Sequence, residues 1–233
     1  SLYNLTELGA IFWPRIKVLN PSKTVYGVSE TITVPPCGHI AGVIARTDSL
    51  RPGGIYLPPA GVERGIIFGA QGLEMSEVTN EKKRDLVYPA LINPITSKPG
   101  FPIHIDGHRT LKRNGNFPSI PERRGVLFIE RSLKEAVMFA LHSNNDAALR
   151  STVERTIEQF LLGQMQLGAF RTTNPETAFY VDVGDGLNDL ATQRQGILKI
   201  RVGLATQSPI DWVVFEFSQD LSALENAQAL ENA

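Results

Sequence analysis

The sequence has 233 residues, 42% of them hydrophobic and 20% charged, which is typical of a globular protein with a sizeable core. Its 23 Lys and Arg residues nearly balance its 24 Asp and Glu residues, and it has no long basic run, so we expect no nucleic-acid partner. No run of about 18 apolar residues occurs, which predicts no membrane insertion. A single cysteine, Cys37, excludes an internal disulfide and a multi-cysteine zinc site.

The first part of the chain predicts two strands and a helix. Residues 10–19 form an apolar run that predicts a strand, and residues 20–26 contain the Asn, Pro, Ser and Lys of a turn. Residues 31–34 alternate like a second strand, which two prolines end. The small and apolar residues 38–51 predict a helix that packs closely against a neighbouring element.

The next part is irregular. Residues 51–72 are rich in Gly and Pro and predict a loop with a short strand at residues 65–68. Residues 81–92 predict a helix that stops before an Asn-Pro pair, because the residue before proline is disfavoured in helices. Residues 102–107 alternate like a strand.

Two long amphipathic patterns follow, at residues 123–142 and 146–167. Asn144 or Asn145 is expected to cap the second helix, because its side chain can accept a hydrogen bond from a free backbone N–H of the first turn. We expect the two helices to form a hairpin across one face of a sheet.

The final third predicts three strands, at residues 177–183, 196–205 and 211–218. In the second, Leu, Ile and Val alternate with Lys, Arg and Gly, which predicts one buried face. The short connections favour mixed or antiparallel pairing. The predicted fold class is therefore α/β (α+β): a mixed β-sheet with packed helices, including a long helical hairpin, and an extended C-terminal strand or arm.

One segment has the residue types of a metal site. Alternation along a strand would place His104, Asp106 and His108 on one face, and two imidazoles with a carboxylate are a common ligand set. The alternative is a strand end at which Asp106 and Gly107 make a turn. The sequence has no H-E-x-x-H spacing that would support the metal site.

Other catalytic and binding motifs are absent from the sequence. Residues 182–189 are acidic, but their spacing does not match a calcium-binding loop. No G-x-G-x-x-G, P-loop or G-x-S-x-G motif occurs, and Cys37 next to Gly38 and His39 is only a weak candidate for a nucleophile pair. We therefore expect no catalytic site and no cofactor.

The last predicted strand is apolar at nearly every position. A strand buried on both faces needs partners on both sides, and an exposed edge would promote aggregation. We therefore expect this strand to be completed by, or donated to, another chain, with Pro209 as a hinge before it. Its candidate intersubunit residues are Trp212, Val213, Val214, Phe215 and Phe217.

Several segments together resemble the contractile tail sheath family of phages and related injection devices. Residues 34–48 (VPPCGHIAGVIARTD) resemble the family's VPPSGHVAGVYARTD, with Cys37 in place of Ser. Shorter blocks occur in the family's order along most of the chain, at residues 10–18, 57–61, 92–95, 107–111, 123–130, 144–145 and 205–215. An ordered series of blocks is more specific than any single block.

The resemblance implies a structural protein and not an enzyme. It implies a homo-oligomer of sheath subunits that polymerises helically around a tail tube and contracts to drive the tube through the host envelope. The implied partners are the tail tube protein and the baseplate and tail terminator proteins. The implied location is the virion tail, assembled in the host cytoplasm.

The resemblance also implies a domain division. The family's N-terminal half has no counterpart here, so residues 1–217 are expected to be the C-terminal part of the sheath core domain and residues 218–233 a C-terminal tail. Two alternatives remain open at this point: a metal-dependent enzyme that uses His104, Asp106 and His108, and a non-contractile tail or baseplate protein.

Overall fold

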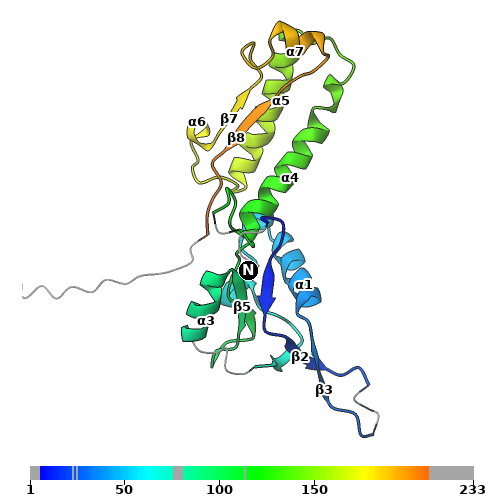
Figure 1. The fold of residues 1–233 in the computed structure, drawn as a ribbon, viewed down its shortest axis with the longest axis vertical. Helices are drawn as coiled ribbons and strands as arrows, with labels where there is room; N and C mark the ends of the chain where they lie inside the picture. Colours follow the sequence, from blue (N-terminus) through cyan, green and yellow to red (C-terminus); the bar gives the residue numbers. More distant parts are fainter. Residues whose placement is uncertain (1–5, 23, 25, 76–80, 113, 210–233) are drawn as a thin grey trace, which may run out of the picture.

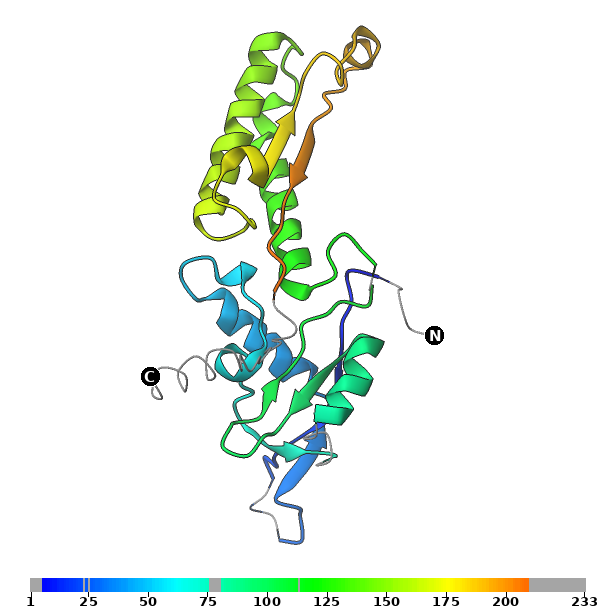
Figure 2. The same ribbon diagram turned by 90° about the vertical axis from the view of Figure 1, so that its left-hand side faces the viewer.

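A computed structural model describes residues 6–22, 24, 26–75, 81–112 and 114–209. Two lobes lie end to end along its long axis (Figure 1). The lower lobe contains α1, α3 and most of the strands, whereas the upper lobe contains the long helices α4 and α5. The two lobes stay distinct when the molecule is turned by 90° (Figure 2).

Two small sheets form the framework of the lower lobe. In the first, with order β1-β5-β6, β1 runs parallel to β5 and β6 antiparallel to it; in the second, with order β3-β2-β4, both pairs are antiparallel. The strands are β1 (Ile11–Trp13), β2 (Ile16–Leu19), β3 (Thr31–Val34), β4 (Ala70–Leu73), β5 (Ile92–Thr96) and β6 (His104–Ile105).

The prediction of one strand over residues 10–19 was wrong. The run forms two strands that belong to different sheets, with Pro14 and Arg15 between them. Proline has no N–H to donate to a ladder, so a strand ends readily at this point. The turn at residues 20–26 and the strand at residues 31–34 follow as predicted, within the described residues.

Two helices were predicted in the lower lobe, and the structure contains both with changed ends. Helix α1 (Cys37–Asp48) confirms its prediction. The predicted helix 81–92 is α3 (Glu81–Val87) and the 3₁₀ turn η3 (Tyr88–Ala90), after which Leu91 takes a left-handed φ of 63° and β5 begins. The loop 51–72 contains two short helical elements, η1 (Gly54–Tyr56) and α2 (Gly61–Arg64).

Two short strands were misplaced. The strand predicted at residues 65–68 is a single bridge between Ile66 and His104, and the strand of this region is β4 instead. The strand predicted at residues 102–107 retains only His104 and Ile105. One hydrophobic core joins α1 to both sheets of the lobe; its buried members are Ile16, Ile40, Val43, Ile67, Leu73, Ile95 and Ile105.

The upper lobe confirms the predicted helical hairpin. It consists of α4 (Ile120–Ala136), the 3₁₀ turn η4 (Met138–Ala140) and α5 (Ala147–Gln166). The cap of α5 is Asp146, whose side chain accepts from the Leu149 N–H at 2.7 Å, and not Asn144 or Asn145. Asn145 instead donates to the Ile197 carbonyl at 3.1 Å.

A two-stranded antiparallel sheet packs against α5. It pairs β7 (Phe179–Asp182) with β8 (Arg201–Leu204) and is flanked by the short helices α6 (Pro175–Ala178) and α7 (Leu190–Arg194). The predicted buried face is confirmed, because Leu198, Ile200, Val202 and Leu204 pack on the core of the lobe. The predicted strand 211–218 lies outside the described residues. Within the described residues the strands form three small sheets where the sequence predicted one mixed sheet, and β1-β5-β6 is itself mixed.

A buried amide, that of Asn188, organises the acidic segment 182–189. Asn188 is fully buried and donates to the carbonyls of Val183 and Lys199 at 3.1 and 2.9 Å, while its oxygen accepts from the Lys199 N–H at 2.7 Å. Asp189 caps α7, and hydrogen bonds from Thr192 hold the pKa of its carboxyl below the usual value. This segment is therefore a loop that links the end of β7 to the residues just before β8.

We expect Leu161→Ala to lower the free energy of unfolding by about 2–5 kcal/mol, because Leu161 is fully buried in the core of the upper lobe. Chemical denaturation monitored by circular dichroism measures the change. Leu190→Ala is the matched control, since Leu190 is 70% exposed and its truncation should have little effect. Equal losses for the two variants would contradict this packing.

Candidate functional site

The chain after β8 returns from the upper lobe to the junction between the lobes (Figure 1). The Ala205 N–H donates to the Ala178 carbonyl at 2.8 Å, and the Ala205 carbonyl accepts from the Arg171 N–H at 3.0 Å. Thr206 forms an isolated bridge with Phe170. We call residues 205–209 the return segment, because it leads directly to the predicted hinge and arm.

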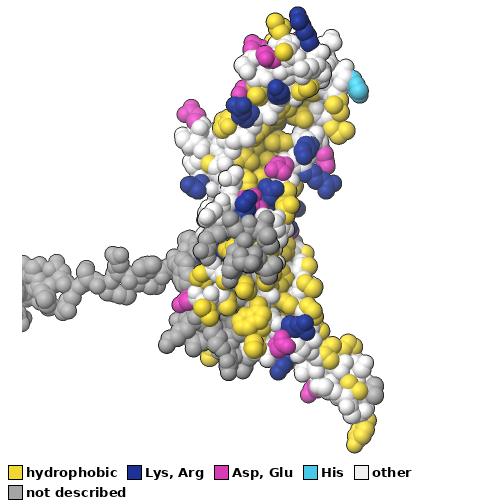
Figure 3. Space-filling model, viewed as in Figure 1, with side chains coloured by type: hydrophobic (Ala, Val, Ile, Leu, Met, Phe, Trp, Pro, Cys, Tyr) yellow, Lys and Arg dark blue, Asp and Glu magenta, His cyan; other side chains and the backbone are white. Residues whose placement is uncertain are grey.

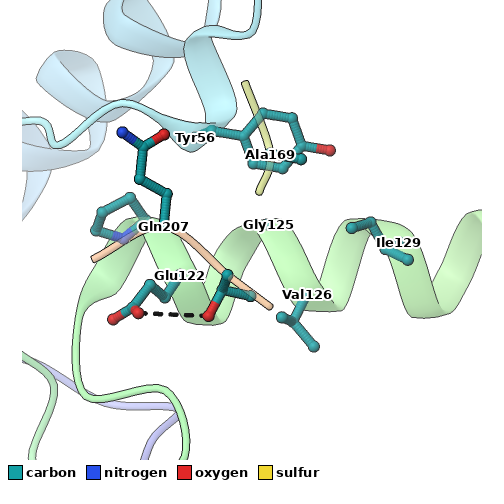
Figure 4. Close-up of a pocket in the computed structure, with 9 residues that line it drawn as sticks. Tyr56, Glu122, Gly125, Val126, Ile129, Ala169 and Gln207 are labelled. Atoms are coloured by element: carbon teal, nitrogen blue, oxygen red, sulfur yellow. Dashed lines mark hydrogen bonds between the residues drawn. The ribbon is translucent and has the colours of Figure 1, made fainter. Parts of the chain in front are cut away.

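A buried carboxylate holds the return segment. Glu122, in the first turn of α4, is only 6% exposed. One oxygen accepts from the Ser208 hydroxyl at 2.8 Å and, more weakly, from the Thr206 hydroxyl at 3.4 Å. The dashed line in Figure 4 marks the hydrogen bond between this carboxylate and Thr206. Hydrogen bonds to a charged group are stronger than neutral ones, so the carboxylate fixes the return segment onto α4.

The same carboxylate caps α4. Its second oxygen accepts from the Ser119 hydroxyl at 2.6 Å and from the Ser119 N–H at 3.3 Å, while the Glu122 N–H donates back to the Ser119 hydroxyl at 3.3 Å. This is a capping box, and a negative charge at a helix N-terminus is stabilised by the helix dipole. Glu122 thus joins the start of the upper lobe to the end of the described chain.

Tyr56 joins the lower lobe to the helical hairpin. Its ring lies against Gly125 of α4, and its hydroxyl donates to the Gln164 side-chain oxygen of α5 at 2.8 Å. Burial raises the pKa of the Tyr56 hydroxyl, so it remains a donor at neutral pH. The gap that Tyr56 shares with Glu122, Val126 and Ile129 measures only about 10 Å³, so the packing here is tight (Figure 4).

Two further contacts join the lobes. Arg124 of α4 forms a two-pronged ion pair with Asp48 at the end of α1, with one N–O distance of 2.8 Å. Gly53 has a φ of 67° and approaches the Leu167 carbonyl so closely that a Cβ would collide with it. The junction is therefore held by a bidentate ion pair, a partly buried hydroxyl and close backbone contact.

A larger cavity of about 550 Å³ lies beside the return segment. Its walls include Tyr56, Arg64 and Arg84 together with the last described residues, Ser208 and Pro209. We call it the junction cavity. Pro209, the predicted hinge, lies on its wall, whereas the predicted intersubunit residues Trp212, Val213, Val214, Phe215 and Phe217 lie outside the described residues.

The three candidate metal ligands have other partners. His104 is buried, with Nδ1 donating to the Pro102 carbonyl at 2.8 Å and Nε2 lying 3.2 Å from the Thr96 hydroxyl. Asp106 pairs with Arg84 at 3.1 Å. Across the described part of the chain, no group of three or more His, Cys, Asp or Glu residues could hold a metal ion. The geometry therefore gives no support to the metal-dependent alternative.

Sequence reasoning missed Glu122 and Tyr56. The spacing Ser119-x-x-Glu122 is the signature of a capping box and would have moved the predicted helix start from residue 123 to residue 120. The hydrogen bonds from Thr206 and Ser208, and the approach of Tyr56 to Gly125, join residues distant in sequence and leave no local pattern.

Two curated proteins are similar in sequence to this chain. The tail sheath protein of Enterobacteria phage T4 is 29% identical over 136 residues, which cover 58% of this chain and 20% of that protein. The tail sheath protein of Salmonella phage ViI is 27% identical over 186 residues, 79% of this chain and 28% of that protein. The chain thus spans less than a third of the length of either relative.

Solved structures share the fold. The sheath complex of an extracellular contractile injection system, PVC, in the contracted state matches with a TM-score of 0.80 at 25% identity, over 95% of this chain and 58% of that one. The helical sheath of the anti-feeding prophage in the contracted state matches with a TM-score of 0.78 at 28% identity, over 91% and 56%. The chain is therefore similar in sequence and in fold to contractile tail sheath proteins.

The similarity to sheath proteins confirms the family resemblance and the α/β fold class. A chain from the baseplate of the anti-feeding prophage also matches, with a TM-score of 0.80 at 26% identity over 93% of this chain and 56% of that one. No protein-family model matches the chain. Among the described residues, no helix is long and apolar enough to cross a membrane.

We expect Glu122→Ala to lower the free energy of unfolding by about 2–3 kcal/mol, because it removes a helix cap and the acceptor of the return segment. Ser208→Ala removes one hydrogen bond and should cost about 1 kcal/mol. Urea denaturation measures both. Glu158→Ala, at an exposed position of α5, is the control. A Glu122 effect no larger than this control would show that the carboxylate does not hold the junction.

Two helical glycines should respond with opposite sign to the same substitution. A Cβ on Gly125 would lie 2.8 Å from the Tyr56 ring, so we expect Gly125→Ala to destabilise the protein despite the higher helix propensity of alanine. A Cβ on Gly163 of α5 would meet nothing within 4 Å, so Gly163→Ala should raise stability by about 0.5–1 kcal/mol. Thermal unfolding compares the two, and a stabilising Gly125→Ala would mean that Tyr56 does not pack here.

Proposed function

We propose that this chain is part of a sheath subunit that polymerises helically around a tail tube and contracts to drive the tube through the host envelope. The observation that carries the proposal is the match to a contractile sheath complex over 95% of the chain. The curated relatives, both named tail sheath proteins, support the same function. The whole subunit is longer than this chain in these relatives, so the chain supplies one portion of it.

The junction geometry supports a rigid body with a tether. The lobes are joined by the Glu122 carboxylate, the Tyr56 hydroxyl and the Asp48–Arg124 ion pair. Pro209 ends the anchored return segment and is the proposed hinge. A polymer whose subunits rotate while staying linked needs such a body and a strand that binds a neighbour by backbone hydrogen bonds. The proposed strand consists of Trp212, Val213, Val214, Phe215 and Phe217.

Exposed apolar side chains support contacts with other subunits. Hydrophobic groups are visible on this face of both lobes (Figure 3). Large exposed apolar areas mark interaction sites more often than single exposed residues do. On and just after α4, the exposed members are Leu127, Phe128, Met138, Phe139 and Leu141, with exposed fractions between 38 and 64%.

The remaining parts of the proposal follow the family. The subunit forms a homo-oligomer, with the tail tube protein and the baseplate and tail terminator proteins as further partners, and it is assembled in the host cytoplasm into the virion tail. It acts as a structural protein and not as an enzyme. Residues 1–217 belong to the C-terminal part of the core domain, and residues 218–233 form a tail.

Electron microscopy of negatively stained particles tests the proposal on the full-length protein that contains this chain. We expect tubes or rings from the intact protein, and a folded protein that does not polymerise when the chain is ended after Pro209, because the linking strand is lost. Circular dichroism checks that the shortened protein folds. Monodisperse intact protein under all conditions would contradict the sheath function, and loss of folding on truncation would place the strand in the subunit's own core.

A further inference from the structure

Asn114 and Gly115 lie in the loop between β6 and α4 and form the one Asn-Gly pair of the sequence. Asn114 stands in a turn outside the helices and strands, and its side chain is exposed. Among the described residues, neither the Asn114 side chain nor the Gly115 N–H has a hydrogen-bond partner. Both groups are therefore available to react with each other.

The two residues of an Asn-Gly pair can form a ring without an enzyme. The backbone nitrogen of the glycine loses its proton to base and bonds to the side-chain carbonyl carbon of the asparagine, and the bond from that carbon to the amide nitrogen breaks to release ammonia. Water then opens the cyclic imide at either carbonyl, which gives aspartate or isoaspartate. Glycine hinders this attack least, because it has no Cβ and allows close approach of the backbone. Asparagine is among the thermally labile residues of proteins.

The other described asparagines are less suited to this reaction. Asn188 is fully buried, and Asn145 uses both its amide group and its oxygen in hydrogen bonds. Asn116 and Asn144 are exposed, but the residue that follows each of them has a Cβ that hinders the attack. The remaining three precede proline, whose nitrogen has no proton to lose: Asn20, Asn93 and Asn174.

The turn also holds the N-terminal segment in place. The Glu7 carboxylate lies against the backbone of Gly115, at the place that a Cβ would occupy, and accepts from the Asn116 N–H at 3.1 Å. An acid in place of Asn114 would add a second negative charge one residue from this contact, and like charges repel. Isoaspartate would also lengthen the backbone before Gly115 by one methylene group. Both products therefore act against the contact between Glu7 and Asn116.

We propose that Asn114 is a site of spontaneous modification, at which the Gly115 nitrogen converts the asparagine to aspartate and isoaspartate, and that the products release Glu7 from the turn. The free Gly115 N–H and the exposed, unbonded Asn114 side chain support the first step. The position of the Glu7 carboxylate supports the second. The inference goes beyond the sheath function and does not rest on it.

Incubation of the full chain at body temperature in mildly alkaline buffer tests the first step. Peptide mapping by mass spectrometry measures conversion at each asparagine, and labelling by isoaspartyl methyltransferase measures isoaspartate in the peptide that contains residue 114. We expect Asn114 to convert several-fold faster than Asn116 or Asn144, and to convert more slowly in mildly acidic buffer, because the Gly115 nitrogen must lose its proton. Asn114→Gln should abolish the label in this peptide, since its longer side chain would close a larger ring, whereas the matched control Asn116→Gln should retain it.

A free peptide of residues 110–118 is the reference for the same reaction without the fold. If that peptide converts while Asn114 in the folded chain converts no faster than Asn116, the fold protects the pair and the proposal is overturned. A rate at Asn114 that does not respond to pH would also contradict it.

Hydrogen exchange tests the release of Glu7. The Leu111 N–H donates to the Gly9 carbonyl at 2.9 Å, two residues after Glu7, and reports whether the N-terminal segment stays in place. We expect its exchange to be several-fold faster in Asn114→Asp and in the isoaspartate form than in the unaltered chain. Glu7→Ala should give a similar increase, to which Asn114→Asp adds little. Asn144→Asp, which adds the same charge at an exposed position before α5, is the control.

Unchanged exchange in Asn114→Asp and in the isoaspartate form, or an effect equal to that of Asn144→Asp, would overturn the release of Glu7. Both measurements are made on the unassembled chain and report chemistry and local opening, whereas microscopy reports polymerisation. This proposal and the proposed function can therefore fail separately.

Discussion

The buried carboxylate of Glu122 is the interaction on which the two-lobed structure depends. A carboxylate that is 6% exposed is costly unless its lone pairs are satisfied, and here four hydrogen-bond contacts from Ser119, Thr206 and Ser208 satisfy them. Ser119 lies directly before α4, and Thr206 and Ser208 lie in the return segment. The Glu122 side chain therefore links the first and last residues of the upper lobe at its base. The helix dipole adds to this stabilisation at no further conformational cost.

Around this carboxylate, the contacts between the lobes are few but directional. The planar guanidinium group of Arg124 binds both carboxylate oxygens of Asp48, and the Tyr56 hydroxyl donates to Gln164 across the junction. Such contacts restrict rotation between the lobes more than an apolar surface of the same size, because they require defined geometry. Gly53 and Gly125 allow the backbones and the Tyr56 ring to come close enough for these contacts to form.

Local features of this fold could be predicted from the sequence, whereas its junction could not. The periodicity of α4 and α5 and the alternation from Leu198 to Leu204 are local, and the structure confirms them. Pro14 divides a run that the sequence pattern predicts as one strand. The division was missed because a strand pattern does not reveal which sheet each half joins. Glu122 had a local signature as a cap but none as the acceptor for Ser208, since that role depends on how the chain returns after β8.

If the residues after Pro209 form the proposed arm of a sheath subunit, this arrangement determines which contacts would bear a force applied to the arm. A force on the residues after Pro209 passes along the backbone to Ser208, whose hydrogen bond to Glu122 transmits part of it to the first turn of α4. From there it divides between the α4 axis, which runs into the core of the upper lobe through Ile129, and the Asp48–Arg124 pair, which leads to α1. Under the proposed function, both lobes then move as one body, and the change of angle between neighbouring subunits falls on the proposed arm and not on the junction.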